Sequence, residues 1–317
     1  MHPSPSIILF TTAAGAGYGL LFLLGLGAAQ LLPATSGFGL AGTGLALALI
    51  VTGLVSSLAH LGHPERAWRA ISQWRSSWLS REGALALATF APAAVLSCGW
   101  VVLEDTQGWF ALAGLLAALG AAATVWATGM IYASLKPVRA WHRPLTAPLY
   151  LAFALMSGAL LLHLLLAAFG APRSVAGALA ALATLLAFGL KAIHWQGIAA
   201  EAPRSTPESA TGLGHLGLVR MIEPPHTQTN YLLDEMGYRI ARKHARKLRL
   251  LAYALGLGGA LALTLLALIA EGVVATLAAA LAAASGLAGI LLERWLFFAE
   301  ATHTVTLYYG RRADGAD

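Results

Sequence analysis

Charged side chains are scarce in this sequence. Asp, Glu, Lys and Arg make up 11% of its 317 residues, whereas hydrophobic residues make up 58%. A water-soluble domain typically carries about 25% charged residues. This chain has too few charges to cover a water-facing surface, so its long apolar runs must face lipid or one another. The shortage of charge therefore excludes an ordinary soluble protein and predicts an integral membrane protein.

Cysteine is nearly absent as well. The single cysteine, Cys98, lies inside an apolar run. One cysteine cannot form an intrachain disulfide, and it cannot supply the several thiolates that hold an iron–sulfur cluster. A small apolar side chain buried between helices is the ordinary explanation for such a residue. The chain by itself therefore supports neither a disulfide framework nor an iron–sulfur centre.

Basic residues outnumber acidic ones, which gives a net charge of +6 and a pI of about 9.7. Such an excess is compatible with nucleic acid binding. Here, however, the basic residues lie in the short segments between apolar runs, where a membrane protein carries the charges that set its orientation. We therefore expect membrane lipids, and no nucleic acid, among the partners.

Eight apolar runs are long enough to cross a bilayer, which takes about 20 helical residues. The first run follows no lysine or arginine and is long for the core of a signal peptide, so we expect it to be retained. The sequence thus predicts an all-α integral membrane protein that forms one domain over residues 1–317. The expected transmembrane helices are 7–32, 38–59, 83–103, 109–133, 146–170, 175–197, 249–270 and 273–298.

Lysine and arginine are distributed unequally between the two sides that eight spans define. Three connections on one side, 60–82, 134–145 and 198–249, and the segment after the last span hold nearly all of them. The exceptions are Arg173 on the other side, and Lys191 and Arg294 inside helices. Basic connections stay in the cytoplasm. We therefore expect both termini to be cytoplasmic.

Polar side chains are densest in the connection 60–82, which we interpret as an interfacial loop. His60 and Glu82 end and begin neighbouring helices at similar depth. An ionisable group at a membrane boundary that faces a helix bundle is a functional candidate. An imidazole and a carboxylate can together move protons to or from a redox-active ring. Between them, tryptophans recur near helical spacing among arginines, which predicts a short amphipathic helix in the interface.

The same region carries a family resemblance. The stretch LAHLGHPERAWRAISQWRSSWLSRE resembles the signature of the DmsC-type anchor subunits, the membrane subunits of dimethyl sulfoxide reductase and related molybdoenzymes. Three further segments fit this family: MIYASLKPVRAWHRPLTAP, IEPPHTQTNYLLDEMGYRIARKHARKLR and ERWLFFAEATHTVTLYYG. The last two most closely resemble the anchor of the Soe-type sulfite dehydrogenases. The resemblance covers nearly the whole chain and includes the eight spans.

The resemblance implies a three-part complex in the bacterial inner membrane. A molybdenum catalytic subunit and a four-cluster iron–sulfur subunit would dock on this anchor, which binds a quinone, ubiquinone or menaquinone, and carries no redox metal. In the family, the histidine that ends helix 2 and the glutamate that opens helix 3 are linked to quinol binding, and they match His60 and Glu82. His63 beside His60 leaves open which imidazole faces the ring. Arg69 is the further candidate at this site.

The iron–sulfur subunit would dock on the basic face. The connection 198–248 is too short and too polar to form a domain with its own core, and its second half reads either as a docking segment or as a basic helix that touches lipid phosphates. The candidate docking residues come from three connections. They are Arg66, Trp68, Arg139, His142, Tyr231 and Arg242.

A b-type haem needs two axial ligands at matched depth on facing helices. His163 is the only histidine deep within a span, so no haem is expected there, and a hydrogen-bonded histidine between helices is its ordinary explanation. A haem at the basic side stays open, because His60, His194 and His303 lie near that boundary.

Two further groups of polar residues bear on function. Lys191, Glu293 and Arg294 are expected to form a structural charge cluster. Because the polar face is cytoplasmic, the sequence favours electrons that pass from cytoplasmic sulfite through molybdenum and iron–sulfur centres to quinone. The alternatives are a dimethyl sulfoxide (or related) reductase that oxidises menaquinol, a secondary transporter, and a purely structural anchor. A transporter usually carries ionisable residues near mid-membrane, and this chain has few.

Overall fold

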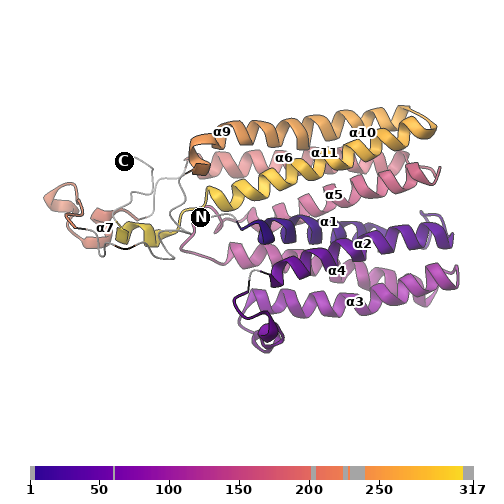
Figure 1. Cartoon of the computed structure of the whole chain (residues 1–317), viewed down its shortest axis with the longest axis horizontal. Coiled ribbons are helices and arrows are strands. Elements are labelled where there is room, and N and C mark those ends of the chain that lie inside the picture. Colours follow the sequence, from indigo (N-terminus) through magenta and orange to yellow (C-terminus); the bar gives the residue numbers. More distant parts are fainter. Residues whose placement is uncertain (1–3, 60, 201–204, 224–227, 229–239, 310–317) are drawn as a thin grey trace.

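The computed structural model describes residues 4–59, 61–200, 205–223, 228 and 240–309. Eight helices in these residues are long and apolar enough to cross a membrane, as the sequence predicts. Figure 1 shows them side by side as one elongated bundle. They are α1 (Pro5–Gly27), α2 (Ser36–Leu58), α3 (Trp78–Val102), α4 (Trp109–Ala133), α5 (Thr146–Ala168), α6 (Ser174–Ala200), the seventh span His244–Ile269, and α11 (Gly272–Ala299).

Helices α1 and α5 form the centre of the bundle and are its most buried spans. Helix α1 packs against α2, α4, α5 and α11, and α5 packs in addition against α6. The two central helices cross where Gly19 faces Ala154 and Gly158, and a methyl group added to either glycine would overlap the other helix. Small residues let membrane helices approach this closely. The glycines therefore place α1 and α5 in direct backbone contact.

The seventh span is irregular. It consists of α9 (Ile240–Tyr253) from His244 onwards, the π-helical segment η3 (Ala254–Gly259) and α10 (Ala260–Ile269). The π segment lies where Gly256 meets Gly289 of α11 and the ring of Phe188. Ser285 donates a hydrogen bond of 2.8 Å to the carbonyl of Leu255. The π segment disturbs the regular backbone hydrogen bonds of the helix, and this hydroxyl supplies a hydrogen bond to one of the carbonyls concerned. Lipid could not supply one.

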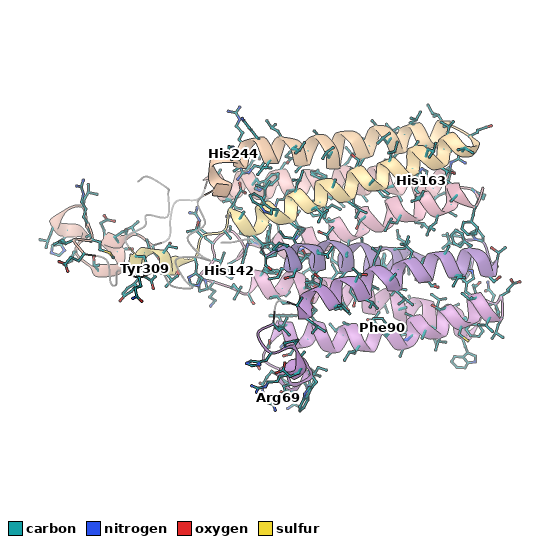
Figure 2. The ribbon with its side chains drawn as sticks, viewed as in Figure 1. Arg69, Phe90, His142, His163, His244 and Tyr309 are labelled. Carbon is teal, nitrogen blue, oxygen red and sulfur yellow. The ribbon has the colours of Figure 1, made fainter. Side chains whose placement is uncertain are left out.

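The start of α1 and the end of α11 lie at one end of the bundle (Figure 1). The short elements η1 (Pro64–Gln73), α7 (Pro207–Thr211), η2 (Gly214–Leu216) and η4 (Thr304–Tyr309) lie at the same end. We call this the basic end, because the arginine-rich connections are there. Figure 2 shows His142 and His244 towards this end and His163 towards the other.

One expectation about a single residue needs correction. Cys98 is exposed on the outside of α3, where it would face lipid, and is not buried between helices. In the second half of the connection 198–248, the described part is helical, since α9 begins at Ile240 and continues directly into the membrane. Residues 231–239 lie outside the described part of the chain.

Candidate functional site

Glu82 lies inside the bundle near the basic end. Helix α3 begins at Trp78, and the Ser77 side chain caps it by accepting a hydrogen bond from the Ser80 amide. One turn later, Glu82 points inward and is only 5% exposed. Its carboxylate oxygen lies 2.5 Å from the hydroxyl of Thr128 on α4. A carboxyl group buried among membrane helices is costly, which makes Glu82 a functional candidate.

The Thr128 hydroxyl has two partners but only one proton to donate. Its oxygen lies 2.5 Å from Glu82 Oε1 and 3.0 Å from the carbonyl oxygen of Thr124. When Glu82 is ionised, Thr128 can donate to the carboxylate. When Glu82 is protonated, the carboxyl can donate to Thr128, which then donates to Thr124. The hydroxyl therefore stabilises both protonation states of Glu82.

A small cavity lies on the other side of Thr128, between α1, α4, α5 and α11. Its volume is about 20 Å³. Thr12 Oγ1 and the hydroxyls of Tyr18 and Tyr150 line it, and these buried oxygens have no hydrogen-bond partner of acceptable geometry among the described residues. A cavity of this size holds one water molecule when polar groups surround it. We call it the central cavity; it suits a water molecule and is too small for a ring.

Three charged side chains are buried between α6 and α11. Lys191 Nζ lies 2.5 Å from Glu293 Oε1, and Arg294 Nε lies 2.9 Å from Glu293 Oε2. These ion pairs confirm the predicted charge cluster of Lys191, Glu293 and Arg294. The Arg294 guanidinium also lies 4.0 Å from the centre of the Tyr150 ring and lines the central cavity. The cluster therefore reaches from α6 to the space beside Thr128.

A larger cavity of about 260 Å³ opens near the basic end. We call it the basic-end cavity. His194 is buried there and its Nδ1 has no hydrogen-bond partner among the described residues. Arg249 and Glu300 form an ion pair of 2.9 Å at its wall. The lining residues are Ala140, Lys191, His194, Trp195, Ile198, Ala245, Arg249, Leu296, Phe297 and Glu300.

Two of the other predicted quinone-site residues, His63 and Arg69, lie apart from the bundle interior. His60 is outside the described residues. His63 is exposed and lies 3.0 Å from Glu65, and the guanidinium of Arg69 lies 5.4 Å from the centre of the exposed Trp68 ring. Both side chains thus contact residues of the same loop, one or two positions away in the sequence. Of the three predicted residues that the structure describes, Glu82 is the one that lies inside the bundle.

The interfacial loop forms the predicted amphipathic segment, but as a 3₁₀ helix, η1. Trp68 and Trp74 of this loop are exposed. Arg81 ties the loop to α3, because it donates hydrogen bonds of 3.0 and 2.7 Å to the carbonyls of Trp74 and Arg75. Figure 2 shows Arg69 on η1, which projects from the side of the bundle at the basic end.

The predicted docking residues differ in accessibility. Arg66 and Trp68 are exposed on η1, whereas Arg139 and His142 are partly buried in the connection between α4 and α5. The His142 ring nitrogen lies 2.6 Å from the carbonyl oxygen of Ala133 at the end of α4, so part of this side chain is engaged within the chain. Tyr231 and the side chain of Arg242 lie outside the described part.

The segment after α11 is fastened to the same connection. Val138 and His303 form an antiparallel bridge, and the Thr304 amide donates a hydrogen bond of 3.0 Å to the carbonyl of Pro137. Trp141 Nε1 donates to the carbonyl of Phe297 at 2.8 Å. Partial burial lowers the pKa of His303, and its Nδ1 accepts a hydrogen bond from the Val305 amide. These contacts join two connections into one surface at the basic end.

At the opposite end, a polar contact joins α2 to the turn before α4. The Ser36 amide donates a hydrogen bond of 3.3 Å to Glu104. Hydrogen bonding from the Ser36 side chain, and then from this amide, lowers the pKa of the Glu104 carboxyl. Towards this end of the bundle, the ring nitrogens of the buried His163 have no hydrogen-bond partner of acceptable geometry among the described residues, and the Arg173 backbone is the polar group beside the ring. Neither feature connects to Glu82.

Sequence reasoning missed Thr128, Tyr18 and Tyr150. Hydroxyl side chains are common in membrane helices, where they bond to the carbonyl one turn back. Only the rotation of each helix shows which of them faces a carboxyl group. The available signal was weak: Thr124 and Thr128 lie one helical turn apart in a span that otherwise consists mainly of apolar residues.

Comparisons with known proteins identify relatives over nearly the whole chain. The family model described as DMSO reductase anchor subunit (DmsC) matches residues 1–310. A sulfite dehydrogenase subunit of Allochromatium vinosum is 33% identical over 338 residues, which cover 98% of this chain and 99% of that protein. No solved structure matches the chain. The two matches confirm the resemblance that the sequence motifs indicated.

Proposed function

The chain belongs to the DMSO reductase anchor subunit family, DmsC, and from this premise we propose that it is the quinone-binding membrane anchor of a molybdenum and iron–sulfur oxidoreductase. In this proposal it forms a heterotrimer in the bacterial inner membrane with a molybdenum catalytic subunit and a four-cluster iron–sulfur subunit. The anchor passes electrons between the iron–sulfur subunit and the quinone pool. Because the family is one of anchor subunits, we prefer this function to that of a secondary transporter.

Glu82 is the observation that carries this proposal. A buried carboxyl group at the start of α3 can give a proton to a quinone oxygen, or take one from a quinol. Thr128 supports the carboxyl in both protonation states. The central cavity is too small for a ring, so the ring would approach Glu82 from the interfacial loop. His60, His63 and Arg69 of that loop would hold the ring oxygens.

We propose that electrons flow from sulfite to quinone on the cytoplasmic side. The relative from Allochromatium vinosum is named as a subunit of sulfite dehydrogenase. The arginine-rich basic end, which by the positive-inside rule would be cytoplasmic, offers a docking surface for the iron–sulfur subunit. Dimethyl sulfoxide reduction by menaquinol is the alternative, since the family takes its description from that enzyme.

The test uses the intact complex, purified with its partner subunits. We expect Glu82→Gln to slow sulfite-dependent reduction of decylubiquinone by roughly 100-fold, the lower end of what positioned proton transfer contributes. His60→Ala should slow the same reaction. Sulfite oxidation with a soluble dye as acceptor should stay unchanged, because that reaction bypasses the anchor.

Two results would contradict parts of this proposal. Undiminished quinone turnover in both variants would show that the ring binds elsewhere. A complex that reduces dimethyl sulfoxide with quinol, and shows no sulfite-dependent quinone reduction, would reverse the direction of electron flow and replace the substrate. Exchange of decylubiquinone for a short-chain menaquinone in the same assay identifies the preferred quinone.

A further inference from the structure

Polar groups extend through the bundle interior from the basic-end cavity to Glu82. The two cavities lie on either side of the charge cluster of Lys191, Glu293 and Arg294. Lys191 lines the larger cavity and Arg294 lines the smaller one. The cluster is 0–2% exposed, and buried charges among membrane helices tend to mark ion or proton pathways.

The first step leads from the basic-end cavity to Glu293. With about 260 Å³, the cavity has room for several water molecules. His194 at its wall has a buried ring nitrogen without a partner among the described residues, which a water molecule would satisfy. The Lys191 ammonium group faces the same space and lies 2.5 Å from the Glu293 carboxylate. Water in this cavity therefore reaches groups that can exchange protons.

The second step leads from Glu293 to the central cavity. Arg294 joins them, but a guanidinium keeps its proton, so it can orient neighbours and cannot relay a proton. The Tyr150 hydroxyl can both donate and accept. It lines the central cavity together with Thr12 and Tyr18, and their oxygens lack partners of acceptable geometry among the described residues. One water molecule in that cavity would satisfy them and link Tyr150 to Thr128.

The last step leads from the central cavity to Glu82. Thr128 lines this cavity and lies 2.5 Å from the Glu82 carboxyl oxygen. Because a hydroxyl can both accept and donate, Thr128 can take a proton from the cavity water and pass its own to Glu82. The residues of all three steps come from α1, α3, α4, α5, α6 and α11, so the path runs across the centre of the bundle.

We infer that these groups form a proton path from the basic end to Glu82, by way of the basic-end cavity, Lys191 and Glu293, Tyr150, a water molecule in the central cavity, and Thr128, with Arg294 orienting Tyr150. The inference rests on the proposed quinone function. Each quinone takes up two electrons from an iron–sulfur cluster of the partner subunit and two protons. The Glu82 O–H bond breaks as a quinol O–H bond forms, and the path then returns a proton to Glu82.

The experiment compares conservative variants of the intact complex, with decylubiquinone as acceptor. Thr128→Val and Tyr150→Phe keep the side-chain shape and remove the hydroxyl. We expect each to slow quinone reduction by roughly tenfold or more, with an increased solvent deuterium isotope effect and an unchanged KM for quinone. Thr128→Ser restores a hydroxyl and should recover most of the rate.

Ser157→Ala is the matched control. Ser157 lines the same cavity, but its hydroxyl already donates to the Phe153 carbonyl at 2.8 Å, so its loss should change the rate by less than about twofold. Dye-linked activity that co-purifies with an affinity-tagged anchor reports, for every variant, whether the complex has assembled. A variant that assembles poorly is measured by single turnover in lipid nanodiscs, which needs only a small intact fraction.

The outcomes separate the path from the function that it serves. If Glu82→Gln is slow while Thr128→Val and Tyr150→Phe reduce quinone at the wild-type rate and isotope effect, the path is wrong and the quinone function stands. If Thr128→Ser is as slow as Thr128→Val, the hydroxyl is not a relay and the path is also wrong. If Glu82→Gln itself has no effect, the proposed quinone site fails.

Discussion

At the scale of single residues, Glu293 has the most demanding environment. Its carboxylate holds two cations, Lys191 and Arg294, and all three side chains are almost fully buried. The sequence indicated this cluster, because three ionisable residues stand near the same end of two apolar runs. It could not indicate that the cluster borders a cavity beside Thr128, since this depends on how α4, α5 and α11 are rotated.

Loss of the Glu293 charge should destabilise the protein strongly. We expect Glu293→Gln to cost about 3–5 kcal/mol, because it leaves two buried cations without a counter-charge. The midpoint of thermal denaturation in detergent measures this. Glu65→Gln is the control, since Glu65 pairs with His63 and Arg66 on the exposed loop and such pairs contribute at most about 1 kcal/mol. Equal midpoints for the two variants would contradict a stabilising role for the cluster.

Glu82 illustrates what sequence reasoning achieved at the candidate site. A carboxyl group that opens an apolar run stands out by itself, and its burial agrees with the expectation of a group facing the bundle. The neighbouring imidazole could not be assessed in the same way, because His60 is outside the described residues. The hydroxyl groups around Glu82 were not predicted, because the sequence does not show whether a threonine or tyrosine of a membrane helix faces the bundle interior or the lipid.

At the scale of helices, the eight spans were predictable because their signal is local: about 20 apolar residues must be helical in lipid. The irregular seventh span was not predictable. Its π segment arises where Gly256 of one helix meets Gly289 of another, and a single sequence does not show which helices touch. The central position of α1 and α5 likewise follows from glycines whose partners lie far away in the chain.

The crossing of α1 and α5 leads to a prediction about glycines. We expect Gly19→Ala to destabilise the protein by about 1–3 kcal/mol, because the added methyl group overlaps the backbone of Ala154. Gly44→Ala on α2 is the matched control, since its methyl group would enter open space and alanine favours a helix by up to about 1 kcal/mol. Chemical or thermal denaturation in detergent measures both. A Gly19→Ala variant as stable as Gly44→Ala would show that the helices can separate without cost.

At the scale of the whole molecule, the basic connections lie at one end of the bundle (Figure 1), because every second connection between alternating spans lies at the same end. Charge segregation was predictable because it depends only on the order of apolar runs and basic residues. The neighbours of each helix, and the contact between the α4–α5 connection and the segment after α11, depend on packing and were not predictable. The side of the membrane on which the basic end lies is a proposal from the positive-inside rule.

Cysteine labelling tests that orientation. In a background with Cys98→Ala, we expect a membrane-impermeant maleimide to label Pro172→Cys in intact cells, and to label Ala210→Cys only after permeabilisation. Pro172 lies in the connection beside Arg173, and Ala210 lies in α7 at the basic end, and both positions are exposed. The reverse pattern would place the basic end outside the cytoplasm. It would also contradict the proposed cytoplasmic oxidation of sulfite.

The attachment of the segment after α11 to the α4–α5 connection has a consequence for biosynthesis. Val138 meets His303 only when all eight spans have been inserted, because His303 lies in the segment that follows the last of them. The surface at the basic end is therefore unfinished while the ribosome is still translating the chain. The soluble subunits would then bind only after the full-length anchor has been released from the ribosome. A prematurely terminated chain would lack this surface, would bind no partner subunits and would be exposed to proteases.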